Sequence, residues 1–417
     1  MEQINAYVLI IAASVIIILS YFFGEISRKT NIPSVLMLLT LGILLRQLLI
    51  STMGKVIDLL PLLELLGIVG LIMIVLEAAL DLDLSREKLP LLLKALWVSI
   101  VSLFVSAFAV AGIFMGLLNT DLINALIYAI PLSIMSSAIV IPSVANLNKD
   151  KKEFMIYESA FSDILGIMFF FMLIQSAEAS SIGQVVGSIS LNLILTLLLS
   201  IVASYGLIYV FHKLKSDIRL FLLIAVLILL YALGKMLHLS SLIIILAFGL
   251  ILNNRWIFFK GKIKEYINDD SIQDVYQQLR LVTIESSFVV RTFFFVIFGL
   301  SISISSLLNF KVLLISLLII IFIYGVRWIV VRLFIRKNYL LEWSIAPRGL
   351  ITVLLFFNIP IEFTIVEFQS EILLVVIIVS SIIMTIGMIK FGKQSDNLIV
   401  DIDLSEEMSG SLESQID

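Results

Sequence analysis

Long apolar runs, separated by short polar segments, organise almost the whole chain. A membrane-spanning helix needs about 20 such residues, because each residue adds 1.5 Å and the bilayer core is about 30 Å thick. The pattern predicts thirteen spans, of which the ninth is short and the twelfth is weakly apolar. The spans are 6–22, 33–50, 62–82, 91–118, 122–147, 153–176, 186–211, 218–236, 238–252, 281–302, 307–335, 343–359 and 369–390. We therefore expect an all-α integral membrane protein of about 13 transmembrane helices. The first span follows no basic region, so we expect it to be retained rather than cleaved as a signal.

Basic residues between the spans indicate the orientation. With the N-terminus outside, the predicted outside loops hold three basic residues, Lys55, Lys235 and Lys311, and the inside loops hold eighteen. The eighteen are Arg28, Lys29, Arg86, Lys88, Lys149, Lys151, Lys152, Lys213, Lys215, Arg219, Arg255, Lys260, Lys262, Lys264, Arg336, Lys337, Lys390 and Lys393. Cytoplasmic loops are rich in Lys and Arg, and one missed helix would invert every later loop. This asymmetry favours thirteen spans with the C-terminus in the cytoplasm, and we expect a bacterial inner membrane.

The composition excludes several functional classes. Of the 417 residues, 61% are hydrophobic and 14% are charged, whereas soluble domains are about half apolar and a quarter charged. The net charge of −3 argues against a nucleic-acid partner. The chain has no cysteine, and its two histidines, His212 and His238, lie near predicted helix ends. We therefore expect no disulfide, no thiolate or histidine metal site and no cofactor.

The ends of the third and tenth spans show similar residue types. Residues 79–84 and 299–304 share the order small, Leu, polar, apolar, polar, apolar. The third helix would run inward and the tenth outward, as an inverted repeat requires. We expect a membrane domain at 1–392, with repeat one at about 6–176, a linker helix at about 186–211 and repeat two at about 218–392. Chance similarity between two helix ends is the alternative. The tail at 393–417 is acidic, and we expect it to be disordered in the cytoplasm.

The sixth span carries polar residues where only apolar ones are expected. Glu158 and Ser162 lie four residues apart, as do Ser159 and Asp163, so all four share one helix face. Asp163 lies about ten residues into this span, or about 15 Å deep, near the middle of the bilayer. Burial disfavours an ionised carboxylate at that depth. We therefore expect Asp163 to bind a cation or a proton; a structural aspartate hydrogen-bonded between helices is the alternative.

Further charged residues are predicted inside the membrane. Arg348 and Glu158 lie at similar depths, so we expect a structural ion pair between them; an arginine that reaches to the interface is the alternative. Glu77 of the third span is expected to orient the site or to interact with Arg348, and an interhelical hydrogen bond fits equally well. Arg291, with Glu285 six residues before it, has either a functional or an anchoring role.

The fifth span contains two prolines around a serine-rich stretch. Residues 131–142 read Pro-Leu-Ser-Ile-Met-Ser-Ser-Ala-Ile-Val-Ile-Pro. Prolines leave backbone carbonyls without partners and serines add hydroxyl oxygens, which favours an interrupted helix that lines a cation site through Ser136 and Ser137. A kinked helix with serines bonded to their own backbone is the alternative. The twelfth span, around 347–349, is the expected second broken helix.

Together these residues resemble the cation–proton antiporter superfamily, which includes NhaP-type and Kef-type transporters and animal sodium–proton exchangers. Residues 158–163 resemble the NhaP-type Glu-Ser-x-x-Asn-Asp motif, and residues 76–80 resemble the Phe-Glu-Gly-x-Leu segment. Residues 347–349 resemble the Arg-Gly motif, whose arginine pairs with the glutamate of the sixth helix. Residues 136–140 are closer to the Kef-type Ser-Ser-Thr-Ala-Ile segment. The order and spacing match over roughly 6–392.

The resemblance implies the antiporter fold, in which two inverted six-helix halves contain broken crossing helices. It implies a homodimer in which helices five, six and twelve move as a block against a scaffold. It also implies exchange of Na⁺ or K⁺, with Li⁺ as a further candidate, for protons, in pH homeostasis. We expect the cation and the proton to compete for Asp163, with Ser136, Ser137, Ser159 and Ser162 supplying hydroxyl oxygens.

Two departures from the family pattern bear on the mechanism. Ser162 stands where the family usually has Asn or a second Asp, and Met135 and Ser136 replace the NhaP-type Thr-Asp pair. The site therefore offers one carboxylate, which predicts electroneutral exchange of one cation for one proton. Two other functions stay open: a sensor or scaffold subunit that has lost transport, and a proton-coupled carrier for an organic solute. No enzymatic activity is expected.

Overall fold

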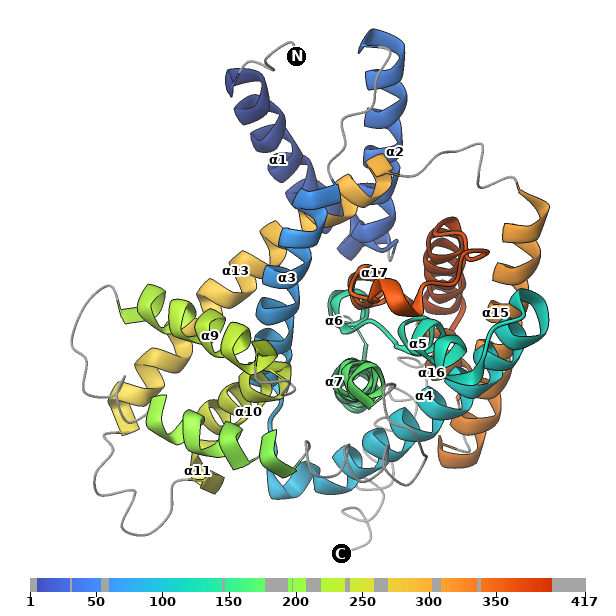
Figure 1. The fold of residues 1–417 in the computed structure, drawn as a ribbon. Helices are drawn as coiled ribbons and strands as arrows, with labels where there is room; N and C mark the ends of the chain where they lie inside the picture. Colours follow the sequence, from blue (N-terminus) through green and yellow to red (C-terminus); the bar gives the residue numbers. More distant parts are fainter. Residues whose placement is uncertain are drawn as a thin grey trace, which may run out of the picture.

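The structure, a computed structural model, contains helices and no strands in the residues that it describes (Figure 1). These are 6–30, 32–53, 60–144, 147–176, 194–196, 198–207, 219–236, 241–258, 269–301, 309–335 and 339–391. The helices of the first half are α1 (Ala6–Thr30), α2 (Ser34–Met53), α3 (Leu60–Asp81), η1 (Arg86–Lys88), α4 (Leu89–Leu118), α5 (Leu122–Ser133), α6 (Ser137–Ser143) and α7 (Lys149–Ser176). Those of the second half are α9 (Arg219–Met236), α10 (Ser241–Asn253), α11 (Arg255–Phe258), α13 (Asp269–Ser301), α15 (Phe310–Ile335), α16 (Leu340–Ser344), α17 (Leu350–Phe357) and η2 (Ile361–Phe363). Two further helices lie at Ile194–Leu207 and Glu371–Phe391.

The helices pack as two bundles (Figure 1). In the first bundle, α13 packs against α2 and α3, and α3 also packs against α10. In the second bundle, α4 packs against α5, α7 and α15, and α7 packs against both α5 and α6. The bundles meet where α17 contacts α3 and α13, and where α7 contacts α3 and α10. The short helix α17 therefore lies at the junction between the bundles.

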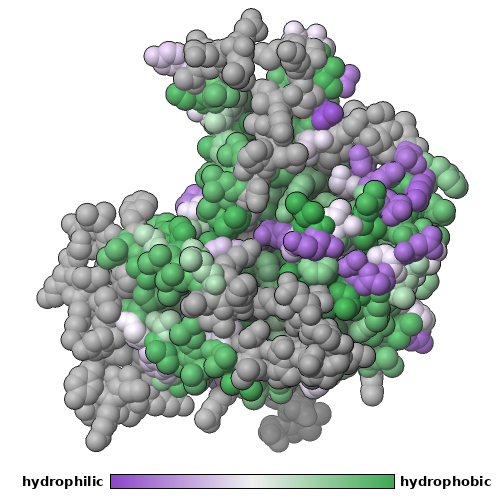
Figure 2. Space-filling view, viewed as in Figure 1, coloured by the Kyte–Doolittle hydropathy of each residue, from purple (hydrophilic) through white to green (hydrophobic). Residues whose placement is uncertain are grey.

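The outer surface suits a lipid environment. Eight helices are long and apolar enough to cross a membrane among the residues described. Large apolar side chains are exposed along α1, where Tyr7, Leu9, Ile11 and Phe22 are each more than half exposed, and apolar residues cover much of the face in Figure 2. Such exposure would be unfavourable in water. Each of the thirteen predicted spans coincides with helix in the described residues, although the number of crossings stays a prediction.

Two of the predicted spans are interrupted. The fifth span is divided into α5, which ends at Ser133, and α6, which begins at Ser137. The twelfth is divided into α16, which ends at Ser344, and α17, which begins at Leu350. The expected pair of broken helices is thus confirmed, and the kinked-helix alternative for the fifth span is wrong. The boundaries of the inverted repeat and of the acidic tail stay predictions, and the tail lies outside the described residues.

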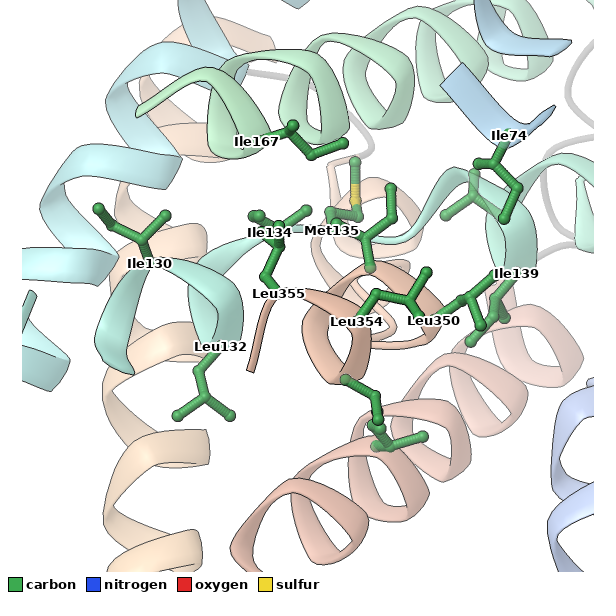
Figure 3. Packing of buried hydrophobic residues seen from close by; sticks show 14 of the residues in the cluster. Ile74, Ile130, Leu132, Ile134, Met135, Ile139, Ile167, Leu350, Leu354 and Leu355 are labelled. Carbon is green, nitrogen blue, oxygen red and sulfur yellow. The ribbon is translucent and has the colours of Figure 1, made fainter. Parts of the chain in front are cut away.

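Apolar side chains hold the first break in place. Ile134 and Met135, between α5 and α6, are buried beside Leu354 and Leu355 of α17 and Ile167 of α7 (Figure 3). Gly166 of α7 makes room for this approach, because a Cβ atom there would collide with the side chain of Ile134. The break is therefore packed as tightly as the helices on either side of it.

Candidate functional site

The break in the fifth span binds to α7 through its backbone N–H groups. The N–H of Met135 donates to the hydroxyl oxygen of Ser162 at 2.9 Å, and the N–H of Ser137 donates to Oδ2 of Asp163 at 3.0 Å. Alternate residues of an extended segment point the same way, so residues 135 and 137 meet neighbouring residues of α7. These bonds use two of the amides that the break leaves without a partner within a helix. The predicted site residues Ser162, Asp163 and Ser137 therefore do come together.

Two buried oxygen atoms at this point have no hydrogen-bond partner among the described residues. They are Oδ1 of Asp163 and the hydroxyl oxygen of Ser136. Both side chains are almost fully buried, with 2% and 1% of their surface exposed. A buried polar atom without a partner is costly. An unpaired carboxylate oxygen and a hydroxyl oxygen are hard ligands of the kind that alkali cations bind, and the same carboxylate oxygen can take a proton.

The second break lies directly against the first. The N–H of Ser136 donates to the carbonyl oxygen of Pro347 at 2.9 Å, which joins the two interrupted spans. Gly349 permits this contact, because a Cβ atom on Gly349 would lie 2.6 Å from the hydroxyl oxygen of Ser136. The absence of a side chain on Gly349 therefore leaves room for the Ser136 hydroxyl.

Arg348 binds the C-terminal end of α5, which is buried. Its guanidinium donates from Nε to the carbonyl of Leu132 at 2.9 Å, from Nη2 to that of Ser133 at 3.3 Å, and from Nη1 to that of Ala346 at 2.7 Å. The last carbonyls of a helix have no partner within the helix and carry its negative partial charge. Arg348, which is 3% exposed, thus stabilises the C-terminal end of a half-helix inside the protein.

The predicted ion pair between Arg348 and Glu158 is wrong. Glu158 pairs instead with Arg327 of α15 through two bonds, Nη1 to Oε1 at 2.6 Å and Nη2 to Oε2 at 3.1 Å. Arg327 also donates to the carbonyls of Glu342 and Trp343 near the end of α16. Each arginine therefore caps the half-helix that precedes one break. The break supplies the reason for the error: it frees the carbonyls of Leu132 and Ser133, which compete with Glu158 for the guanidinium of Arg348. The sequence predicts free carbonyls at this break but does not show which side chain binds them.

Sequence reasoning also passed over Arg327 itself. Arg327 lies eight residues before the end of α15, within a predicted span that holds mostly apolar residues. An ionisable residue inside a membrane helix marks a functional or paired position, and that rule applied to Arg327 would have given Glu158 two candidate partners.

The comparison with protein families agrees with this geometry. The family model described as the transmembrane sodium/hydrogen exchanger matches residues 14–391, which is most of the chain. The chain belongs to the sodium/hydrogen exchanger family. A comparison with curated proteins finds no match.

Solved structures of similar fold include those of a sodium proton antiporter. The structure of the sodium proton antiporter MjNhaP1 from Methanocaldococcus jannaschii at pH 8 has a TM-score of 0.65 and 19% sequence identity, and the match covers 93% of this chain and 96% of that one. A map of MjNhaP1 from electron microscopy has a TM-score of 0.65 and 18% identity, and covers 95% of this chain and 98% of that one. The expected antiporter fold is therefore confirmed for this exchanger.

The remaining predicted residues of this exchanger lie away from the free oxygens or are already bonded. Glu77 of α3 does not contact Arg348 but pairs with Arg291 of α13, with Nη2 and Oε1 3.5 Å apart. The pair lies within the first bundle, so Arg291 links two helices there. The hydroxyl of Ser159 donates to the carbonyl of Ile156 of its own helix at 3.1 Å. No group of three or more His, Cys, Asp or Glu side chains gathers in the described part of this exchanger.

Proposed function

We propose that the protein exchanges a monovalent cation, Na⁺ or K⁺, for protons, and that the two ions compete for Asp163. One observation carries the proposal. Of the fully buried carboxylates that the structure describes, Glu158 pairs with Arg327, and Glu342 pairs with Lys151 at 3.3 Å. Asp163 has no basic partner in the described residues, and its Oδ1 has no hydrogen-bond partner there. A charge in this position requires a mobile counter-ion.

The chemistry of the exchange follows from that single group. A cation at Oδ1 of Asp163 neutralises the carboxylate, and so does a proton, but the oxygen does not hold both. The hydroxyl of Ser136 adds a ligand for the cation, and backbone carbonyls or water complete its coordination. The Ser137 N–H bond to Oδ2 fixes the carboxylate in place throughout. Because the other buried carboxylates keep their basic partners, one cation replaces one proton, and exchange is electroneutral.

The two-bundle arrangement supports a proposal for the movement. Asp163 and the first break belong to the second bundle, and the second break lies against the first. Among the described helices, α7 and α17 contact α3, α10 or α13, and α6 contacts α1. We propose that the second bundle carries the neutralised site across the membrane against the first. We further propose that the protein is a homodimer whose interface is formed by the first bundle. We also propose that the N-terminus lies outside and the C-terminus in the cytoplasm.

Proton flux in liposomes tests the proposal. The purified protein is reconstituted, and the internal pH is followed after addition of Na⁺, K⁺, Li⁺ or an organic cation. Asp163→Asn keeps the shape of the side chain and should abolish flux with every cation, while gel filtration and melting show a folded protein. Wild-type protein without flux for any cation would favour a sensor or scaffold subunit. Flux that persists in Asp163→Asn would remove Asp163 from the mechanism.

A further inference from the structure

A small polar cavity lies beside the first break, among helices of the second bundle. Its volume is about 10 Å³, and α4, α7, α15 and residues of both breaks form its walls. Serine side chains of α4, including Ser99 and Ser102, face Glu158, Arg327 and Arg348 across it. Ser162 also lines the cavity. We refer to it as the serine pocket. The exchange mechanism proposed above uses neither this pocket nor the serines of α4.

The walls of the serine pocket contain hydrogen-bonding groups without partners. The hydroxyl oxygens of Ser99 and Ser102 have none among the described residues, and Ser99 is only 1% exposed. Arg348 carries five N–H donors, and its three bonds to backbone carbonyls leave two of them without a described acceptor. The oxygen of Ser162 accepts from the N–H of Met135, so the hydroxyl proton of Ser162 remains to be donated.

The size and chemistry of the pocket fit one class of ligand. A cavity of about 10 to 15 Å³ accommodates one water molecule, which needs two to four polar partners. The guanidinium of Arg348 and the serine hydroxyls can donate to a water, and the carboxylate of Glu158 can accept from it. The two arginines and the one glutamate give a net charge of +1, which repels cations. Chloride is larger than water, and a cavity of about 10 Å³ is too small for it.

We propose that the serine pocket is a binding site for a single water molecule that links α4 to the ion site, and that it does not admit cations. The water joins the hydroxyls of Ser99 and Ser102 to that of Ser162, which in turn holds the N–H of Met135. Through Ser162, the water thus stabilises the break beside Asp163. Because the site is closed to cations, ions do not reach Asp163 through it.

Crystals of the full-length protein, grown in a lipid phase and soaked separately in rubidium and bromide salts, test this site. The probes are water itself, Rb⁺ as the monovalent cation and Br⁻ as the halide. We expect one solvent peak within hydrogen-bonding distance of Ser99 and Ser102, without anomalous signal at either absorption edge. A rubidium peak in the pocket would show a cation site, a bromide peak would show an anion site, and an empty pocket would show neither. Each of these three results overturns the proposal.

Matched variants show whether the serines hold the water. Ser99→Val removes the hydroxyl and fills the space, so the solvent peak should disappear. Ser316→Val is the control, because the hydroxyl of Ser316 on α15 is equally buried and without a described partner but does not line the pocket. The solvent peak in the serine pocket should remain in this variant. If Ser99→Val does not fold, Ser99→Ala should still lower the occupancy of the peak. Unchanged occupancy in the Ser99 variants contradicts the site as we describe it. These results do not depend on transport, so they stand apart from the test of exchange.

Discussion

The bond between Glu158 and Arg327 gives a prediction that separates the observed pairing from the one expected from sequence. Arg327→Ala leaves the Glu158 carboxylate, which is 1% exposed, without a basic partner in the described residues. It also removes the donors to the carbonyls of Glu342 and Trp343 near the end of α16. The variant therefore affects both α7 and the second break.

The magnitude follows from these contacts. Removal of one partner from a buried ion pair costs about 3–5 kcal/mol, because a charge stays buried without compensation. A buried carbonyl that loses its donor adds about 1–3 kcal/mol, less where water enters. We expect Arg327→Ala to lower the free energy of unfolding by about 4–8 kcal/mol. Arg327→Lys should lower the free energy of unfolding less than Arg327→Ala does, because the positive charge remains although the bidentate hydrogen bond to the carboxylate is lost.

A double-mutant cycle measures the pairing itself. The free energy of unfolding is obtained from titration with sodium dodecyl sulfate in mixed micelles for Arg327→Ala, Glu158→Ala and the double variant. The double variant should be more stable than the sum of the single effects predicts, with a coupling of about 2–3 kcal/mol. The matched cycle combines Arg348→Ala with Glu158→Ala, because the guanidinium of Arg348 binds backbone carbonyls instead of Glu158. Its coupling to Glu158 should stay below about 1 kcal/mol.

The comparison of the two cycles decides the matter. Coupling that is larger for Arg348 than for Arg327 would refute the observed pairing and restore the pair expected from sequence. Equal and small couplings would show that the bidentate contact contributes little to stability, contrary to the reasoning from burial.

Two further substitutions address the ion site. Gly349→Ala places a methyl group 2.6 Å from the Ser136 hydroxyl oxygen and should raise the KM for the cation severalfold in the liposome assay. Gly112→Ala on α4 is the control, because a Cβ atom there meets nothing within 4 Å, and it should leave the KM unchanged. Equal effects of the two variants would contradict the role of Gly349. Ser162→Ala removes the acceptor of the Met135 N–H and should lower the free energy of unfolding by about 1–3 kcal/mol, as measured by the same titration. A silent Ser162→Ala would show that the bond does not hold the break.

The residues of the proposed ion site could be selected from the sequence because polar residues stand out in apolar spans. Asp163 and Ser136 were identified from their depth and from the prolines around the fifth span, and the structure brings both to the first break. The break itself was expected from the same residues, since a helix interrupted in a membrane needs polar groups around it.

The partners of the charged residues could not be predicted in the same way. Depth alone places Arg348 and Glu158 at one level, but the contact depends on which side of the bundle each side chain faces. Arg348 lies within a break, and backbone carbonyls at the end of α5 satisfy it. The serine pocket is also hidden in the sequence, because serines such as Ser99 are ordinary in membrane helices and gain importance only beside two buried arginines.

Cation binding to the purified protein at several pH values tests the competition at Asp163 most directly. Isothermal titration with Na⁺ or K⁺, repeated in buffers of different ionisation enthalpy, gives both the affinity and the number of protons released. We predict release of one proton per cation at acidic pH, with an affinity that falls about tenfold for each unit of decreasing pH, and no binding to Asp163→Asn. Binding that does not depend on pH, or that persists in folded Asp163→Asn, would contradict the proposal that one carboxylate serves both ions.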